Sequence, residues 1–127
     1  MDPITVHHVS VNVSDAGRSV AFYTDILGGT VRTDRPDFGF GGAWIDFGPA
    51  QVHLIEAETP SNVGQHFAIL VGDIDVVVGE LRHKGVEIGE PTPVGANRQA
   101  FLSDPDGNLI EIHQLGRAEA GATPSSS

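Results

Sequence analysis

The feature that most limits the fold of this chain is a repeat at an offset of 58 residues. The segment HVSVNVSD at residues 8–15 is matched by HFAILVGD at residues 66–73, with histidine, valine and aspartate at the same places in both. One offset fits the strand, the turn and the start of the helix without a gap. Self-similarity at a fixed period indicates a duplicated structural unit. We therefore predict two copies of one module.

Each copy predicts the same order of elements, namely a strand, a helix and three further strands. In the first copy the apolar residues alternate over 6–13, and Ser14 or Asp15 can cap a helix that ends at Gly28-Gly29. The remaining predicted strands of this copy are 30–33, 43–47 and 51–56. In the second copy the predicted strands are 65–71, 86–88, 99–103 and 109–114, and the predicted helix is 73–85. The sequence thus predicts an α+β fold of two tandem βαβββ modules.

The predicted boundaries give one domain over 1–115, with module one at 4–57 and module two at 64–115. The tail, 116–127, has the sequence GRAEAGATPSSS, with no periodicity and no large apolar residue. Such a composition is typical of a disordered end of the chain.

Four side chains that can bind a metal obey the same repeat. His53 and Glu111 are 58 positions apart, and each follows its module's first histidine, His8 or His66, by 45 positions. Because side chains alternate along a strand, each of the four lies on one face, and the apolar side chains that suit packing against a helix lie on the other face. Three imidazoles and one carboxylate can hold Zn, Ni, Mn, Co or Fe. The alternative is that each histidine is a surface residue or a hydrogen-bonded core residue.

Composition excludes some classes of protein. The formal net charge of −10 disfavours a nucleic-acid partner, which needs a basic surface. No apolar run approaches the ~20 residues of a membrane span, and the N-terminal residues lack the basic and apolar regions of a signal peptide. The absence of cysteine excludes disulfides and thiolate sites and suits a cytoplasmic location.

The motifs resemble those of the vicinal oxygen chelate superfamily of glyoxalases, bleomycin resistance proteins and extradiol dioxygenases. The resemblance covers about residues 4–114 and rests on the first-strand motif H-x-S-x-N-V-S-D, on FY-x-D-I-L-G, on G-x-H-x-A and on DPDGNLIEI. It implies paired βαβββ modules that form a curved mixed sheet around a metal cavity. It also implies a homodimer, because members of this kind often draw one ligand pair from each of two subunits.

The resemblance assigns the metal ligands residue by residue. The usual triad falls on His8, His66 and Glu111. The fourth position is His53, where bacterial glyoxalases carry glutamate and epimerases glutamine, and this departure leaves the reaction open. Glu111 is then both ligand and base, or His53 takes the base role when substrate displaces it. Whether the site lies within one chain or between two chains stays open.

Other residues are candidates for the substrate cavity. Gln99 and Phe101 share a face of the strand that lines the cavity in the family, and His113 lies two residues beyond Glu111, where it can orient the carboxylate. Phe38 and Phe40 lie on the glycine-rich loop RPDFGFGGAW, residues 35–44. This loop is either a lid or substrate wall, or a segment whose two phenylalanines pack under the dimer.

The resemblance and the retained ligand quartet favour a metal-dependent glyoxalase-like lyase or isomerase. Its substrate would be a small oxygenated molecule chelated to a divalent metal. One alternative is an Fe(II) ring-cleaving or other oxygenase, because two histidines and one carboxylate also form the facial triad. Another is an antibiotic resistance protein that binds a drug or transfers a thiol. The substrate and the metal are left open.

Overall fold

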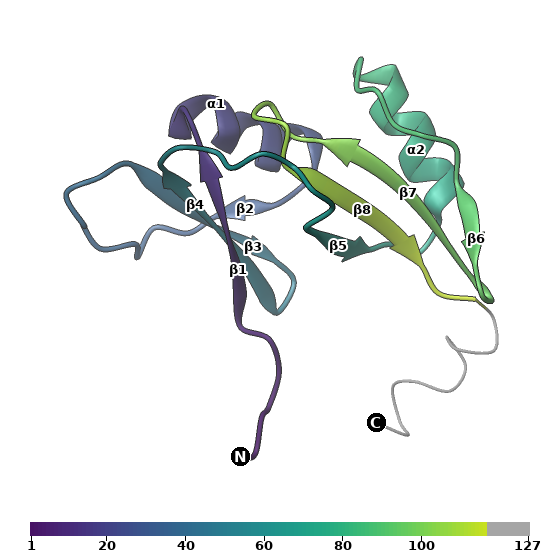
Figure 1. Ribbon diagram of the computed structural model, residues 1–127, viewed down its shortest axis with the longest axis horizontal. Helices are drawn as coiled ribbons and strands as arrows, with labels where there is room; N and C mark the ends of the chain where they lie inside the picture. Colours follow the sequence, from purple (N-terminus) through teal and green to yellow (C-terminus); the bar gives the residue numbers. More distant parts are fainter. Residues whose placement is uncertain (117–127) are drawn as a thin grey trace. The chain divides into compact units, whose positions relative to one another are not determined.

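The computed structural model describes residues 1–116, whose strands form two four-stranded sheets (Figure 1). The chain divides into two compact units. The first unit comprises Met1–Asn62 together with the turn Asp104–Asn108, and the second comprises Val63–Ser103 and the chain from Leu109 onward. Of the predicted tail, residues 117–127 lie outside the described residues, whereas the backbone N–H of Gly116 donates a hydrogen bond to Asn97.

The first unit contains the first βαβββ module. Its elements are β1 (His8–Val13), α1 (Ala16–Ala21), the π-helical turn η1 (Phe22–Ile26), β2 (Thr30–Val31), β3 (Gly42–Phe47) and β4 (Ala50–Glu56). The strand order is β1-β4-β3-β2, with β1 parallel to β4 and the other neighbours antiparallel.

The first helix begins as the sequence predicts but ends differently. The Asp15 side chain accepts a hydrogen bond from the backbone N–H of Arg18, so Asp15 is the N-cap. The helix then widens, because the N–H of Leu27 bonds to the carbonyl of Phe22, five residues back. The helix predicted up to Gly28-Gly29 is therefore α-helical only as far as Ala21 and π-helical over Phe22–Ile26. The widened segment buries Tyr23 completely.

The second unit contains the second module. Its elements are β5 (His66–Leu70), α2 (Ile74–His83), β6 (Thr92–Val94), β7 (Asn97–Ser103) and β8 (Leu109–Gln114). The strand order is β5-β8-β7-β6, again with the first and last strands of the module parallel. Asp73 caps α2 by accepting hydrogen bonds from the N–H groups of Asp75 and Val76.

The strand predicted at 86–88 is wrong. Only Ile88 forms a bridge there, to Leu102, and the edge strand is Thr92–Val94 instead. Gly95 has a φ of 58° and opens a two-residue turn that pairs Val94 with Asn97 as a hairpin. Such tight hairpin turns need a residue that tolerates positive φ. The edge position also accommodates Pro93, which has no N–H to donate.

The register of the two sheets confirms the duplication. His8 pairs with Gln51 across β1 and β4, and His66 pairs with Leu109 across β5 and β8. The partners Gln51 and Leu109 are themselves 58 positions apart, so the repeat holds in three dimensions as well as in the sequence.

Each helix covers one face of its own sheet. α1 packs on β3 and β4, whereas α2 packs on β7 and β8. The strands contribute the buried apolar side chains Val11, Val13, Ile45, Val52 and Leu54 in the first unit and Ala100, Leu102, Ile110 and Ile112 in the second. Helix α2 contributes Ile74, Val78 and Leu81. The opposite sheet faces carry the polar candidates. Among the described residues, none of the helices has the length and apolar character needed to cross a membrane.

Candidate metal-ligand pairs and an aromatic pocket

The second unit brings two predicted ligands into contact. Nε2 of His66 on β5 lies 3.0 Å from Oε1 of Glu111 on the adjacent parallel strand β8. Glu111 is only 8% exposed, and a carboxylate is buried at a high cost unless it is paired or bound. The two candidate ligand atoms, Nε2 of His66 and Oε1 of Glu111, therefore lie next to each other on one face of the sheet.

A second hydrogen bond orients the His66 ring. Its Nδ1 lies 2.8 Å from the backbone carbonyl of Gly64, which can only accept, so Nδ1 carries the proton. The hydrogen bond to Gly64 raises the pKa of His66, and the bond to Glu111 adds to this effect. With Nδ1 engaged by the backbone, Nε2 is the nitrogen available to a metal.

His113 holds the other oxygen of the same carboxylate. Its Nδ1 lies 2.6 Å from Oε2 of Glu111, and its Nε2 lies 2.9 Å from Nδ2 of Asn97. Oδ1 of Asn97 accepts from the N–H of Gly116, which leaves the amide nitrogen to donate to His113. Nδ1 of His113 thus donates a hydrogen bond to the Glu111 carboxylate and positions it.

The first unit brings the other two candidates together. The rings of His8 on β1 and His53 on β4 stack with centroids 3.9 Å apart and planes inclined by 11°. Nε2 of His53 also lies 2.7 Å from the amide oxygen of Gln51. Burial lowers the pKa of His53, and charge on His8 and His7 lowers it further. Neutral imidazole is the form that binds metals.

Each module adds an aromatic side chain opposite its second candidate ligand. Trp44 pairs with His53 across β3 and β4, and the two rings stack at 4.5 Å. Phe101 pairs with Glu111 across β7 and β8, and its ring lies edge-on to His66 at 5.3 Å. The sequence predicted Phe101 as a cavity residue, whereas it placed Trp44 at the end of the loop 35–44 and gave it no contact with His53. The cross-strand partner of His53 in the predicted hairpin 43–56 was the signal that could have found it.

The donor types suit a divalent metal, whereas neither unit supplies a complete site. Imidazole and carboxylate are ligands of Zn, Fe, Mn, Co and Ni, and each unit presents two of them. Within residues 1–116, no group of three or more histidine, aspartate or glutamate side chains is arranged to hold a metal ion. The ligand quartet therefore stays a prediction, with His8 and His53 in the first unit and His66 and Glu111 in the second.

The predicted cavity residues lie in different surroundings. Gln99 is half-buried on β7 and pairs with His113 across the sheet. Phe38 and Phe40 are about half exposed, and their rings stack at 5.6 Å on the loop between β2 and β3. They line a pocket of about 170 Å³ together with Arg35, Trp44, His53, Leu54 and Ile55. Sequence reasoning did not predict the part of Arg35.

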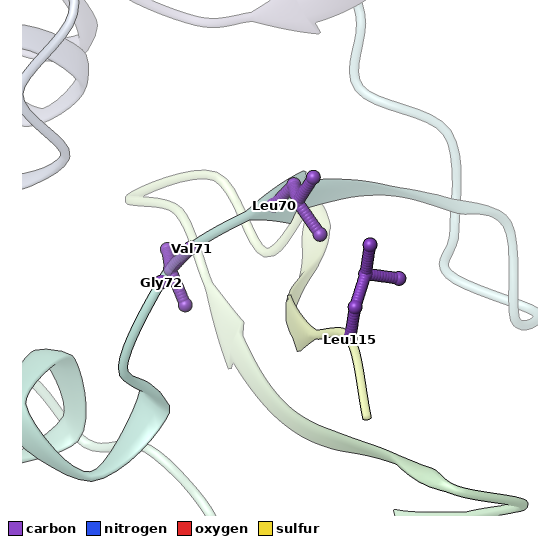
Figure 2. Close-up of a pocket in the computed structure, with 4 residues that line it drawn as sticks. All are labelled: Leu70, Val71, Gly72 and Leu115. Carbon is purple, nitrogen blue, oxygen red and sulfur yellow. The ribbon is translucent and has the colours of Figure 1, made fainter. Parts of the chain in front are cut away.

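A larger hollow in the second unit is lined by apolar residues and glycine only. It measures about 320 Å³ and is lined by Leu70, Val71, Gly72 and Leu115, as Figure 2 shows. These residues carry no titratable or metal-binding side chain. The ligand pairs are therefore better candidates for a functional site than this hollow.

The comparison with protein families decides the classification. Residues 5–112 match the model of the Glyoxalase/Bleomycin resistance protein/Dioxygenase superfamily. The chain belongs to this superfamily. The resemblance inferred from the motifs is thereby confirmed, as is the tandem βαβββ fold.

Two relatives are named lactoylglutathione lyase. The chain is 33% identical to lactoylglutathione lyase GLX1 of Arabidopsis thaliana over 124 residues, which are 86% of this chain and 44% of that protein. It therefore spans less than half the length of this plant relative. The lactoylglutathione lyase of Salmonella typhimurium is 30% identical over 128 residues, with 90% of this chain and 95% of the relative covered.

Solved structures of the superfamily have the same fold. TnmS3, an antibiotic binding protein from Streptomyces sp. CB03234, superposes with a TM-score of 0.79 at 26% identity, covering 91% of this chain and 99% of that one. The superfamily thus includes both a lyase relative and a binding protein of nearly the same length. The activity of this chain has to be argued from its own residues.

Proposed function

We propose that this member of the superfamily is a metal-dependent, glyoxalase-like lyase or isomerase. The observation that supports it most is the repeated arrangement of the candidate ligands. His8 with His53, and His66 with Glu111, occupy equivalent registers in the two sheets. Relatives named lactoylglutathione lyase at 30% identity or more agree with this proposal.

The four candidate ligands would hold a divalent transition metal. Such an ion, when bound, acts as a Lewis acid on a carbonyl or hydroxyl oxygen of the substrate. The proposed substrate carries two neighbouring oxygens, as does the hemithioacetal formed from a 2-oxoaldehyde and a thiol. The ring of His66 is already oriented for this role by Gly64.

The chain's own residues would move the proton. Isomerisation of a hemithioacetal removes a proton from the carbon bearing the hydroxyl group and returns one to the neighbouring carbonyl carbon. Glu111 is the candidate base, because its carboxylate is nearly buried and held at one oxygen by His113. His53 is the other candidate, since its lowered pKa keeps it neutral and able to accept a proton.

The proposal includes a homodimer, which is the state that the resemblance implies. Each unit supplies only two candidate ligands, so the quartet is completed either within one chain or between two chains. The cytoplasmic location expected from the absence of cysteine stays a prediction.

Metal titration of the purified protein tests this proposal. The wild-type chain and the variants His8→Ala, His53→Ala, His66→Ala and Glu111→Gln are titrated with Zn²⁺, Ni²⁺, Mn²⁺, Co²⁺ and Fe²⁺ after chelator treatment. His83→Ala, at the exposed end of α2, is the matched control. We expect all four variants, but not the control, to lose affinity and to lose turnover of methylglyoxal–glutathione hemithioacetal. Wild-type affinity in all four variants would show that the quartet is wrong.

A second candidate function is metal-free binding of a drug. It is favoured by the likeness to TnmS3 and by the aromatic lining of the pocket around Trp44. Failure of the wild-type chain to bind any of the five metals would favour this candidate over the lyase.

A further inference from the structure

Four of the seven residues that line the pocket in the first unit carry rings. Trp44 stacks on His53 at 4.5 Å, and Phe38 lies 6.3 Å from Trp44 and 5.6 Å from Phe40. These rings come from β3, from β4 and from the loop between β2 and β3, which leaves the edge of the sheet in Figure 1. Half-exposed aromatic rings that face one hollow form a stacking surface.

The size of the pocket suits a single ring. Its volume is about 170 Å³. An apolar cavity of about 150 Å³ is large enough to admit benzene. Offset or edge-on contacts with the surrounding rings favour an aromatic occupant over an aliphatic one of the same size.

The pocket also contains one cation with unused donors. The guanidinium carbon of Arg35 lies 5.0 Å from the ring centre of Phe38 and 5.6 Å from that of Phe40. Its one hydrogen bond within the described chain goes from Nη2 to the carbonyl of Phe40. A guanidinium has five N–H donors, so most of them are available to a ligand.

The nearby carboxylates do not neutralise Arg35. Asp34 is paired with Arg32 at 2.7 Å, and Asp37 accepts a hydrogen bond from the backbone of Gly39. No ion pair joins Arg35 to a carboxylate among residues 1–116. In a chain of net charge −10, this local positive charge indicates an anionic ligand group.

We propose that the pocket formed by Arg35, Phe38, Phe40 and Trp44 binds a single aromatic ring that carries a carboxylate or similar anionic oxygen. The ring would stack against Trp44 and the phenylalanines, and the anion would accept hydrogen bonds from Arg35. The binding itself requires no metal. His53 also lines the pocket, so a bound ring lies beside a proposed metal ligand. That the ring is part of the lyase's substrate rests on the proposed function.

The single tryptophan of the chain allows a direct test. The indole N–H of Trp44 gives the one indole signal in a ¹H–¹⁵N spectrum, and chelator-treated protein is titrated with benzoate, cyclohexanecarboxylate and benzamide. Cyclohexanecarboxylate keeps the charge without the aromatic ring, and benzamide keeps the ring without the charge. We expect benzoate to shift the signal saturably and to bind roughly threefold to tenfold more tightly than cyclohexanecarboxylate.

Two pairs of variants separate the contributions. Arg35→Gln should weaken benzoate about tenfold and change benzamide less than about twofold, because only the anion uses the guanidinium. Arg98→Gln is the matched control, since it removes the same charge from an exposed ion pair with Asp75 in the other unit. Phe38→Leu should weaken both aromatic probes, and Val31→Leu, at another exposed apolar position, should not.

The outcomes do not depend on the proposed lyase activity, because no metal is present. Saturable, ring-dependent and Arg35-dependent binding supports the pocket even if the metal titration fails. The proposal is overturned if no probe moves the indole signal at tens of millimolar, if both carboxylates bind equally, or if Arg35→Gln and Arg98→Gln have the same effect.

Discussion

His66 and Glu111 are 45 residues apart in the sequence, yet Nε2 of one lies 3.0 Å from Oε1 of the other. This contact joins the two side chains that are proposed as the ligand pair of the second unit. The same spacing of 45 brings His8 onto His53 as a stacked pair in the first unit. Two pairs of candidate ligands with one spacing are therefore a property of the repeated module, since the parallel first and last strands set their distance.

The first prediction concerns His113, which holds Glu111 but is not a proposed ligand. His113→Ala removes the 2.6 Å hydrogen bond that orients the carboxylate. Loss of such an outer partner lowers metal affinity by about 10-fold to 100-fold. We expect this loss in a competitive titration with a chromophoric chelator. Asn97→Ala, one bond further out, should have a smaller effect. Equal affinity of His113→Ala and wild type would show that His113 does not position Glu111.

The second prediction concerns the buried pair of Tyr23 and Asp104. The hydroxyl of fully buried Tyr23 donates to Oδ2 of Asp104 at 2.9 Å. Burial, together with the Asp104 carboxylate, raises the pKa of Tyr23 well above its usual range, so the hydroxyl stays protonated. Tyr23→Phe should lower the free energy of unfolding by about 1–2 kcal/mol in urea denaturation, because a nearly buried carboxylate loses a donor.

Asp104→Asn should destabilise the protein more than Tyr23→Phe does. Oδ1 of Asp104 also accepts from the backbone N–H groups of Asp106 and Asn108 and so closes the DPDG turn. Arg98→Gln serves as the control, since an exposed ion pair contributes about 0–1 kcal/mol. A Tyr23→Phe variant as stable as wild type would mean that water replaces the lost donor.

The third prediction concerns the two helix caps, which are equivalent under the repeat. Asp73→Ala removes hydrogen bonds to two backbone N–H groups at the start of α2, and Asp15→Ala removes one at the start of α1. Loss of a cap destabilises a protein by about 0.5–2 kcal/mol. We expect both variants to unfold at lower temperature, with the larger shift for Asp73→Ala. Asp2→Ala, in the exposed N-terminal segment, should leave the unfolding temperature unchanged.

Much of the fold could be predicted because it is encoded locally and then repeated. The strand alternation of β1 and the offset of 58 residues were readable from the sequence, and the register of the two sheets confirms them. Of the two caps predicted for the first helix, Ser14 and Asp15, the structure has Asp15, and the equivalent Asp73 caps α2. The contact of His8 with His53 and of His66 with Glu111 could also be predicted, since strand period and spacing fix which side chains share a face. Their role as metal ligands stays a prediction.

The parts that were missed depend on tertiary contacts or on turn geometry. The π-helical end of the first helix buries Tyr23 against Asp104, a contact 81 positions away that no local pattern contains. The edge strand at 92–94 depends on the positive φ of Gly95. Trp44 and Arg35 carry no motif of their own, and only the pairing of β3 with β4 and the path of the preceding loop bring them to one pocket.

The fourth prediction concerns one glycine in a crowded strand and one in an open position of a helix. A Cβ atom on Gly42, at the start of β3, would collide with the backbone carbonyl oxygen of Leu54 and with the Arg35 side chain. Gly42→Ala should therefore destabilise the protein by about 1–3 kcal/mol, as overpacking does, and should disturb the indole signal of Trp44.

Gly79 lies in α2 with nothing near its Cβ position. Gly79→Ala should raise the free energy of unfolding by about 0.5–1 kcal/mol, because alanine restricts the unfolded chain and favours helix. Chemical denaturation of both variants beside wild type measures the two effects, and a Gly42→Ala variant as stable as Gly79→Ala would contradict the close approach of β3 to β4 at this point.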